Sequence, residues 1–204
     1  AVDAGITVIT TNADIEGTKR HWCVGADNAQ GAHIAGRMMG LFLGGKGRIA
    51  VVSSAIASEN NNCYVQLREN EFKRFVRETY PDIQIVTTID SFENPQITYE
   101  KTAQLLRDYQ DLQGLYITCG GVSQVGRALE ESGRAKDIRV ISYEDYPEVV
   151  EFVRKDVIDC TLAGEIQKQG EIPVQLIMDH LVFGKQPEND QVFTEIKVIV
   201  KESL

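Results

Sequence analysis

The fold of this 204-residue chain is indicated first by residues 24–31, VGADNAQG, where an apolar strand changes to a helix. Apolar strand patterns precede this stretch over Ile6–Thr10 and over Trp22–Val24. Asp27 or Asn28 suits the start of the helix, because a side-chain oxygen at that point accepts a hydrogen bond from a backbone N–H of the first turn. The sequence therefore predicts a strand followed directly by a capped helix.

The same change from strand to helix recurs as far as the C-terminus. Most of the strand patterns are continuously apolar, which is typical of strands buried on both faces of a parallel sheet. Strands are expected over Ile6–Thr10, Arg48–Ser53, Ile83–Ile89, Leu115–Thr118, Ile138–Ser142, Asp159–Ala163 and Glu195–Val200. Helical patterns separate them. We therefore predict an α/β fold with doubly wound parallel sheets, as one compact unit or two lobes.

Composition and charge exclude several function classes. The net charge of −9 repels phosphate backbones, so this segment by itself is not expected to bind nucleic acid. No apolar run reaches the ~18 residues of a membrane span. The four cysteines, Cys23, Cys63, Cys119 and Cys160, are far apart, which argues against a thiolate metal site and favours a reducing compartment.

Two glycine-rich turns resemble phosphate loops only superficially. Residues 44–47 follow a helix and enter a strand, and Arg48 stands where a phosphate loop needs Ser or Thr, so a plain turn is expected. Residues 119–121, Cys-Gly-Gly, do lie between a strand and a helix, where ligands of open α/β sheets bind. Because the Gly-x-Gly-x-x-Gly spacing is missing there, we expect a small-molecule cleft rather than a dinucleotide site.

A catalytic constellation is not evident in the sequence. His21, His33 and His180 fall on separate elements, and we place His33 and His180 on exposed faces. The Gly-x-Ser-x-Gly elbow of serine hydrolases is also missing. The chain is therefore not expected to be an enzyme, and no cofactor or metal is implied.

Polar and aromatic residues follow several of the expected strands. Asn12, Phe92, the pair Glu144–Asp145 and Glu165 all stand just beyond strand ends. Carboxylates and amides accept hydrogen bonds from sugar hydroxyls, and an exposed ring stacks on the face of a sugar. The pattern indicates a polyol-binding cleft, although a solvated turn before a proline also explains the acidic pair.

Taken in order, these motifs resemble the type I periplasmic-binding-protein fold, which sugar-transport receptors share with lactose-repressor-like (LacI-type) regulators. The matching segments are residues 5–10, 24–28 with Gly31, 44–52, 68–72, 112–121, 139–144, 169–170 and 196–204. They extend over essentially the whole chain, and their order and spacing are more specific than any one of them.

The resemblance implies two lobes with a truncated N-terminal lobe. Residues 1–26 are then a remnant of the N-terminal lobe and residues 27–164 are the C-terminal lobe. Residues 165–190 form a helix returning to the N-terminal lobe, and residues 191–204 close the C-terminal lobe. On this interpretation the remainder of the N-terminal lobe is missing upstream, together with a helix-turn-helix headpiece or a secretion signal.

The family's ligand contacts map onto six positions of this chain. They are Asn12, Gln66, Phe92, Cys119, Glu144 and Glu165. The match departs from the family where an Asp-Arg pair is replaced by Asn12-Ala13 and where a ligand-binding Arg is replaced by Gln66. Arg68 aligns with a second, more often structural Arg. The two acids among these positions favour an amino sugar or another cationic ligand.

Three function hypotheses follow from the resemblance. The first is the effector-binding domain of a cytoplasmic, homodimeric transcription regulator. A sugar, amino sugar or polyol would close its two lobes and thereby modulate DNA binding by a separate headpiece. The alternative is a secreted or periplasmic sugar-binding receptor of an ABC transporter. An enzyme of doubly wound fold is the third. A helix-turn-helix or a signal peptide upstream would distinguish the first two.

Overall fold

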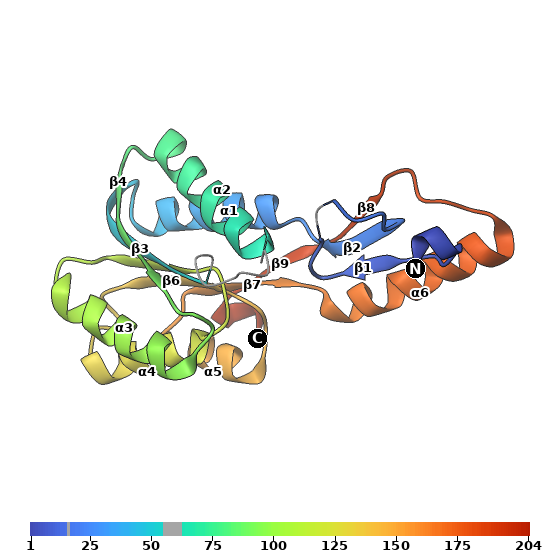
Figure 1. Cartoon of the computed structure of the whole chain (residues 1–204). Helices are drawn as coiled ribbons and strands as arrows, with labels where there is room; N and C mark the ends of the chain where they lie inside the picture. The colour runs from blue at the N-terminus through green and yellow to red at the C-terminus, as the bar shows by residue number, and fades with distance from the viewer. Residues whose placement is uncertain (16, 55–62) are drawn as a thin grey trace. The chain divides into compact units, whose positions relative to one another are not determined.

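The computed structural model describes residues 1–15, 17–54 and 63–204 of the chain (Figure 1). These residues form two compact units. Unit 1 consists of Ala1–Asp27 and Gly164–Lys197, and unit 2 consists of Asn28–Ala163 and Val198–Leu204.

Unit 1 is a small parallel sheet with one long helix. Its strands are β1 (Ile9–Thr11), β2 (Trp22–Ala26) and β8 (Gln191–Thr194), in the order β1-β2-β8. The helix is α6 (Ile166–Phe183), and a short 3-10 helix spans Val2–Ala4.

Hydrogen bonds and ring packing hold α6 against this sheet. The Thr11 hydroxyl donates a hydrogen bond to the Gln169 carbonyl at 2.8 Å, and the buried Gln169 Nε2 donates to Thr194 Oγ1 of β8 at 3.3 Å. The ring of Trp22 packs edge-on against His180, with 5.1 Å between ring centroids.

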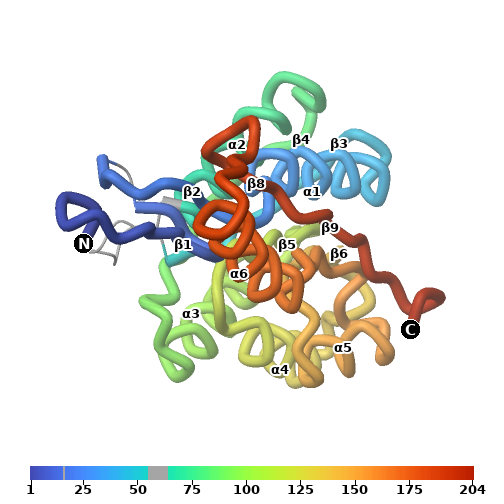
Figure 2. The backbone as a smooth tube through the Cα atoms, turned by 90° about the vertical axis from the view of Figure 1, so that its right-hand side faces the viewer, coloured from blue at the N-terminus to red at the C-terminus, as the bar shows by residue number. Residues whose placement is uncertain are grey.

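Unit 2 is a six-stranded sheet with helices on both faces. The strands lie in the order β4-β3-β5-β6-β7-β9. Their bounds are β3 Lys46–Ser53, β4 Asp82–Asp90, β5 Gly114–Ile117, β6 Arg139–Tyr143, β7 Cys160–Gly164 and β9 Ile196–Ile199. Figure 2 shows α1 and α2 on one side of this sheet and α3, α4 and α5 on the other. The helices span Asn28–Phe42, Cys63–Thr79, Pro95–Asp108, Val122–Ser132 and Pro147–Arg154, respectively.

The apolar strands of unit 2 are buried on both faces, as their sequences predict. Leu115 and Ile117 of β5 belong to a core shared with α3, α4 and α5. On the other face the ring of Phe72 stacks on Tyr116, with centroids 3.9 Å apart. Alternate residues of one strand therefore enter different cores, which explains why these strands are continuously apolar.

Local chemistry sets several helix boundaries. The Asn94 side chain accepts a hydrogen bond from the Ile97 amide at 3.1 Å, and Pro95 occupies the first position of α3. Gly133 ends α4 in the left-handed conformation that favours glycine. At Gly40 of α1 an added Cβ would lie 2.1 Å from the Tyr80 ring, so the glycine allows that ring to pack on the helix.

The parallel sheets and flanking helices confirm the predicted α/β, doubly wound fold class. Two strands differ from expectation. The strand expected over Ile6–Thr10 is found over Ile9–Thr11, because the Val8 amide donates to His21 Nδ1 instead of to a neighbouring strand. Residues 191–204 were assigned together to the C-terminal lobe, whereas Gln191–Thr194 pairs with β2 in unit 1.

Candidate functional site

The carboxyl ends of β3, β4, β5 and β6 bring together one set of polar and aromatic side chains in unit 2. Because these strands pair in parallel, the residues after them meet at the same edge of the sheet. We call this set the strand-end cluster. It comprises Ser54, Phe92, Glu93, Cys119 and Glu144 from the strand ends, together with Tyr64 and Arg68 from α2.

Arg68 organises the strand-end cluster from α2. Its side chain is buried, and its Nε donates to Asn28 Oδ1 at 2.7 Å. Its Nη1 donates to the Thr118 carbonyl at 3.2 Å. The guanidinium carbon lies 3.7 Å from the centroid of the Tyr143 ring, which is cation–π geometry. The donors and the face of this guanidinium are therefore largely occupied by the protein itself.

Glu144 stands beside this guanidinium at the end of β6. Its Oε1 lies 3.8 Å from Arg68 Nη2, and its side chain is 29% exposed. Burial raises the pKa of the Glu144 carboxyl, while the charge of Arg68 opposes the rise. The backbone is fixed on both sides, since the Glu144 amide donates to the Leu162 carbonyl and its carbonyl accepts from Thr161 Oγ1 at 2.6 Å.

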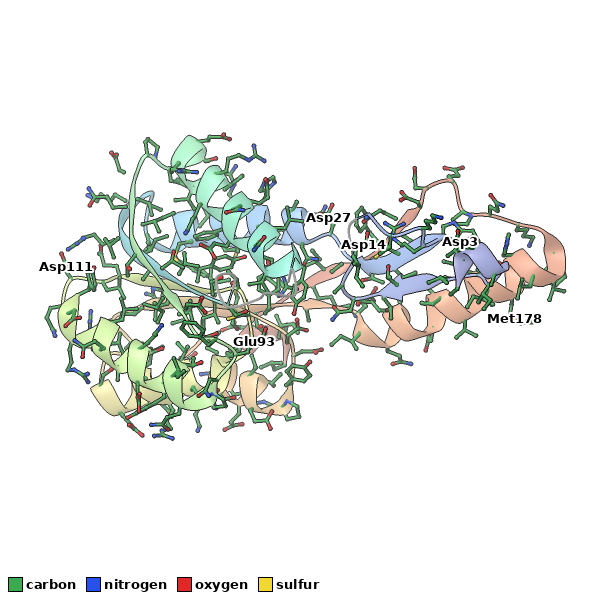
Figure 3. The ribbon with its side chains drawn as sticks, in the orientation of Figure 1. Asp3, Asp14, Asp27, Glu93, Asp111 and Met178 are labelled. Carbon is green, nitrogen blue, oxygen red and sulfur yellow. The ribbon has the colours of Figure 1, made fainter. Side chains whose placement is uncertain are left out.

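Cys119 and Glu93 lie near the same place. The Cys119 thiol is buried 3.4 Å from Ser91 Oγ, and burial raises the pKa of this thiol. Ser54 Oγ donates to Glu93 Oε1 at 3.2 Å, and Glu93 is labelled in Figure 3. Because the thiol stays protonated, Cys119 contributes a weak donor and a small apolar surface, not a nucleophile.

The Tyr64 hydroxyl interacts electrostatically with the carboxylates of Glu93 and Glu144. Burial raises the pKa of the Tyr64 hydroxyl, the charge of Arg68 opposes this, and Glu93 and Glu144 both reinforce it. Both carboxylates therefore lie within electrostatic reach of one hydroxyl.

Phe92 is the exposed aromatic residue of the cluster. Its side chain is 47% exposed, and the amide of Phe92 donates to Asp90 Oδ1 at 2.8 Å. The Lys101 ammonium lies 4.4 Å from the ring centroid. The Phe92 ring, which the Lys101 ammonium contacts, is thus an apolar surface at the same sheet edge as the carboxylates of Glu93 and Glu144.

Phe92, Glu93 and Glu144 of the strand-end cluster have left-handed backbone conformations. Among the described residues, positive φ angles outside glycine occur at Asn12, Phe92, Glu93, Glu144 and Asp156. Such conformations are costly for these residue types and occur disproportionately at functional sites. Asn12, Phe92 and Glu144 were chosen from the sequence as ligand contacts, and this backbone feature is independent of that choice.

Asn12 and Glu165 lie in unit 1. Asn12 is exposed directly after β1, and its amide donates to the Val24 carbonyl at 2.8 Å. Glu165 Oε1 lies 2.9 Å from Lys168 Nζ and 3.2 Å from Lys197 Nζ. Hydrogen bonds from these lysines lower the pKa of Glu165, so its carboxylate already has two cationic partners within unit 1.

The structure therefore brings together Phe92, Cys119 and Glu144 of the predicted residues. Gln66 is an exposed residue of α2. Sequence reasoning did not single out Tyr64, Ser54 or Glu93 as members of the site. For Arg68 the sequence did indicate polar partners inside the protein, because a cation that stands between apolar residues on a buried helix face needs them.

The histidines differ from expectation. His180 is partly buried against Trp22, and the rings of His21 and His180 lie with centroids 6.2 Å apart. His33 Nε2 is 2.9 Å from Glu71 Oε2. Within the described ranges, no group of three His, Cys, Asp or Glu residues is placed to hold a metal ion. No helix in the part of the chain that the structure describes has the length and apolar character to cross a membrane.

Comparison with known proteins connects this geometry to a family. The family model described as "Periplasmic binding protein domain" matches residues 1–186. GanP, a glucose-galactose binding protein from Geobacillus stearothermophilus, is 26% identical and superposes with a TM-score of 0.88, covering 100% of this chain and 70% of GanP. Comparison with curated proteins gave no match.

Two further solved structures agree in fold. A sugar-binding protein of a sugar ABC transporter from Bacillus halodurans is 25% identical, with a TM-score of 0.87 over 98% of this chain and 71% of its own. A solute-binding protein of an ABC transporter from Burkholderia graminis, in complex with D-arabinose, is 19% identical, with a TM-score of 0.87 over 98% of this chain and 69% of its own. These likenesses confirm the type I fold expected from the sequence.

Proposed function

Because the chain belongs to the periplasmic binding protein domain family, we propose that it is the ligand-binding part of a sugar receptor that serves a transporter. The observation that carries the proposal is the strand-end cluster, in which an exposed ring lies at the same sheet edge as two carboxylates. The names of GanP and of the Bacillus halodurans protein support the same ligand class.

The cluster offers the two interactions that sugars need. The apolar face of a pyranose stacks on the ring of Phe92, and sugar hydroxyls donate hydrogen bonds to Glu93 and Glu144. Hydrogen bonds to a charged acceptor are stronger than neutral ones, and carboxylates accept more than one. The ring and the acids thus supply stacking and orientation at one place.

The same residues are held in place before a ligand arrives. Arg68 is fixed by Asn28 and the Thr118 carbonyl, and it in turn lies 3.8 Å from the carboxylate of Glu144. Hydrogen bonds at both the amide and the carbonyl of Glu144, to the Leu162 carbonyl and from the Thr161 hydroxyl, fix its unusual conformation. Acceptors that are already ordered lose little conformational entropy on binding.

A regulator is the second candidate function. One observation favours it: the thiols of Cys23, Cys119 and Cys160 are all buried and free, which suits a reducing compartment. The homodimer, the DNA-reading headpiece and the cytoplasmic location belong to this candidate. Two of the relatives named above, those from Bacillus halodurans and Burkholderia graminis, are ABC transporter proteins, which supports the receptor and an extracytoplasmic location instead. A signal peptide or a helix-turn-helix in the gene upstream of residue 1 distinguishes the two.

The binding proposal is tested by isothermal titration calorimetry with glucose, galactose and arabinose. We expect saturable binding of at least one sugar, weakened about tenfold by Phe92→Ala, because that variant removes one stacking contact. Phe183→Ala is the matched control, since Phe183 is 63% exposed and has Lys185 Nζ 5.3 Å from its ring centroid. Absence of binding, or equal loss in both variants, would refute the proposal.

A further inference from the structure

The strand β4 forms one edge of the six-stranded sheet of unit 2 (Figure 1). It is nine residues long and pairs with β3, and in the part of the chain that the structure describes its other side carries no strand. Its acids, Asp82 and Asp90, stand at its two ends, so residues 83–89 are an uncharged run without proline. Charged residues and proline commonly protect an exposed edge from pairing with another chain. This edge is therefore open to a further strand.

The second half of β4 presents hydrogen-bonding groups on its open side. The register with β3 skips Val86 and then continues without a break over residues 87–90. The Ser91 amide donates to the Ser53 carbonyl of β3 at 2.7 Å. Because successive residues of a strand direct their main-chain groups to opposite sides, the N–H and C=O groups of Thr88 point away from β3. A strand that adds to this edge thus finds a main-chain donor and acceptor at Thr88.

A groove with a volume of about 570 Å³ lies beside this edge. We call it the edge groove, and its lining residues are Lys73 and Arg77 of α2 and Ile83, Gln84, Ile85, Thr87 and Thr88 of β4. The β4 residues include neighbours in the sequence, whose side chains point to opposite faces of the sheet, so the groove follows the edge and not one face. Its described lining holds two cations and no carboxylate, although the chain as a whole carries a net charge of −9.

Arg77 is the cation of the edge groove that lacks an anionic partner. It is exposed in the last turn of α2, and its Nε donates to the Lys73 carbonyl of the same helix at 3.1 Å. Within the described ranges it forms no ion pair, whereas Lys73 Nζ lies 2.5 Å from Glu69 Oε1. A guanidinium donates parallel hydrogen bonds to a carboxylate, and its planar fork fits that group in particular. The remaining donors of Arg77 therefore suit a carboxylate that is brought to the groove from outside.

We propose that the edge groove binds an extended segment of another protein, which adds to β4 as a strand and places one carboxylate side chain on Arg77. Strand addition takes its affinity from main-chain hydrogen bonds and its specificity from side-chain contacts. Thr88 supplies the main-chain groups, Ile83 and Ile85 supply apolar contact, and Arg77 selects an acidic residue. A segment with a basic residue at that position meets two cations and is disfavoured.

The test titrates isotope-labelled protein with a synthetic hexapeptide that is blocked at both ends. The peptide alternates valine with threonine and carries one glutamate in place of a threonine, and three versions place the glutamate at each threonine position. We expect saturable shifts of the backbone amide signals of residues 83–88 at about 1 mM peptide. A matched peptide with glutamine instead of glutamate is expected to bind about tenfold more weakly, because the charge-assisted hydrogen bond is lost.

Two variants locate the bound peptide. Arg77→Ala is expected to remove the tenfold preference for glutamate over glutamine. Arg107→Ala is the matched control, because Arg107 is likewise an exposed arginine in the last turn of its helix, α3, and does not line the groove. Thr88→Pro removes one outward N–H and leaves the pairing with β3 intact, so it should weaken both peptides about tenfold. Circular dichroism verifies that the variants fold.

Four results would overturn the inference. The first is an absence of shifts in residues 83–88 with every peptide. The second is a glutamate preference that is missing or that Arg77→Ala retains, and the third is undiminished binding to folded Thr88→Pro. The fourth is self-association of the chain in sedimentation that Thr88→Pro abolishes, because the edge is then occupied by a second copy. All four leave the proposed sugar site untouched, since the edge groove shares no residue with the strand-end cluster.

Discussion

Asp14→Asn is expected to destabilise unit 1 by about 2 kcal/mol at neutral pH. Asp14, labelled in Figure 3, accepts two hydrogen bonds from the guanidinium of Arg20, of which the one from Nε measures 2.7 Å. Thr10 Oγ1 and the Ile15 amide also donate to this carboxylate. Arg20 additionally lies 3.0 Å from Asp190 Oδ2, so the network joins the segment after β1 to the residue before β8.

The magnitude follows from the pKa of Asp14. The hydrogen bonds from Arg20, opposed by burial, lower this pKa from 3.8 to about 2. A shift of this size corresponds to about 2 kcal/mol, and the Asp14 side chain is only 20% exposed, so solvent screening is limited. Because the folded pKa is depressed, this stabilisation is present above the unfolded value near 4 and is lost as pH falls toward 2.

The assay is urea denaturation followed by tryptophan fluorescence at several pH values. Trp22 is the only tryptophan of the chain and is buried in β2, so its emission reports on unit 1. The stability of Asp14→Asn is expected to fall about 2 kcal/mol below the unsubstituted protein at pH 7 and to equal it near pH 2. Asp3→Asn is the control, because its partner Lys19 is 71% exposed and surface pairs contribute little.

Two results would refute this reasoning. If Asp14→Asn were as stable as the unsubstituted protein at pH 7, the ion pair would contribute nothing measurable. If the difference persisted unchanged at pH 2, it would arise from packing rather than from the charge of Asp14, since a protonated carboxyl and an amide have similar shapes.

Four further outcomes test separate parts of the structure. Gly40→Ala places a Cβ 2.1 Å from the Tyr80 ring and should destabilise unit 2 by about 1–3 kcal/mol in urea denaturation followed by circular dichroism. At Gly170 of α6 an added Cβ has nothing within 4 Å, so Gly170→Ala should instead stabilise unit 1 by about 0.5–1 kcal/mol by the same measurement. A stabilising Gly40→Ala together with a destabilising Gly170→Ala would contradict these contacts. Burial raises the pKa of Cys160 to about 12, so iodoacetamide at pH 8 should modify this thiol only in unfolded protein, as mass spectrometry of labelled peptides would detect. Phe92→Ala should leave the urea midpoint nearly unchanged, because a half-exposed ring contributes little to folding, and a large loss of stability would assign Phe92 a structural role.

Much of the site could be predicted from strand ends. Phe92, Cys119 and Glu144 follow apolar strands, and parallel pairing places the ends of such strands at one edge. Arg68 aligns with a family position that is more often structural, and a structural role for it stays a prediction. Its specific partners, Asn28 and Tyr143, lie 40 and 75 positions away, and no local pattern specifies which side chains meet across that separation.

The remaining differences come from tertiary contacts. Glu165 follows a strand and stays a predicted ligand contact, but no local pattern indicates that Lys197, distant in sequence, pairs with it at 3.2 Å. The strand over residues 191–194 was not expected, because four residues are too short a run for a distinct pattern. Its pairing with β2, far away in the sequence, is what defines it as a strand. His180 was placed on a solvated face, because a helix pattern does not show that Trp22 packs against it.

Hydrogen–deuterium exchange with and without a sugar tests the central claim most directly, because it locates the ligand without any substitution. The sugar used is the one that binds most tightly in calorimetry. In unit 2 we expect slower exchange at the amides of residues 91–94 and 143–146, which belong to the ends of β4 and β6. Unchanged exchange at these amides with protection elsewhere in unit 2, or no protection at saturating sugar, would contradict the assignment of the strand-end cluster as the sugar site.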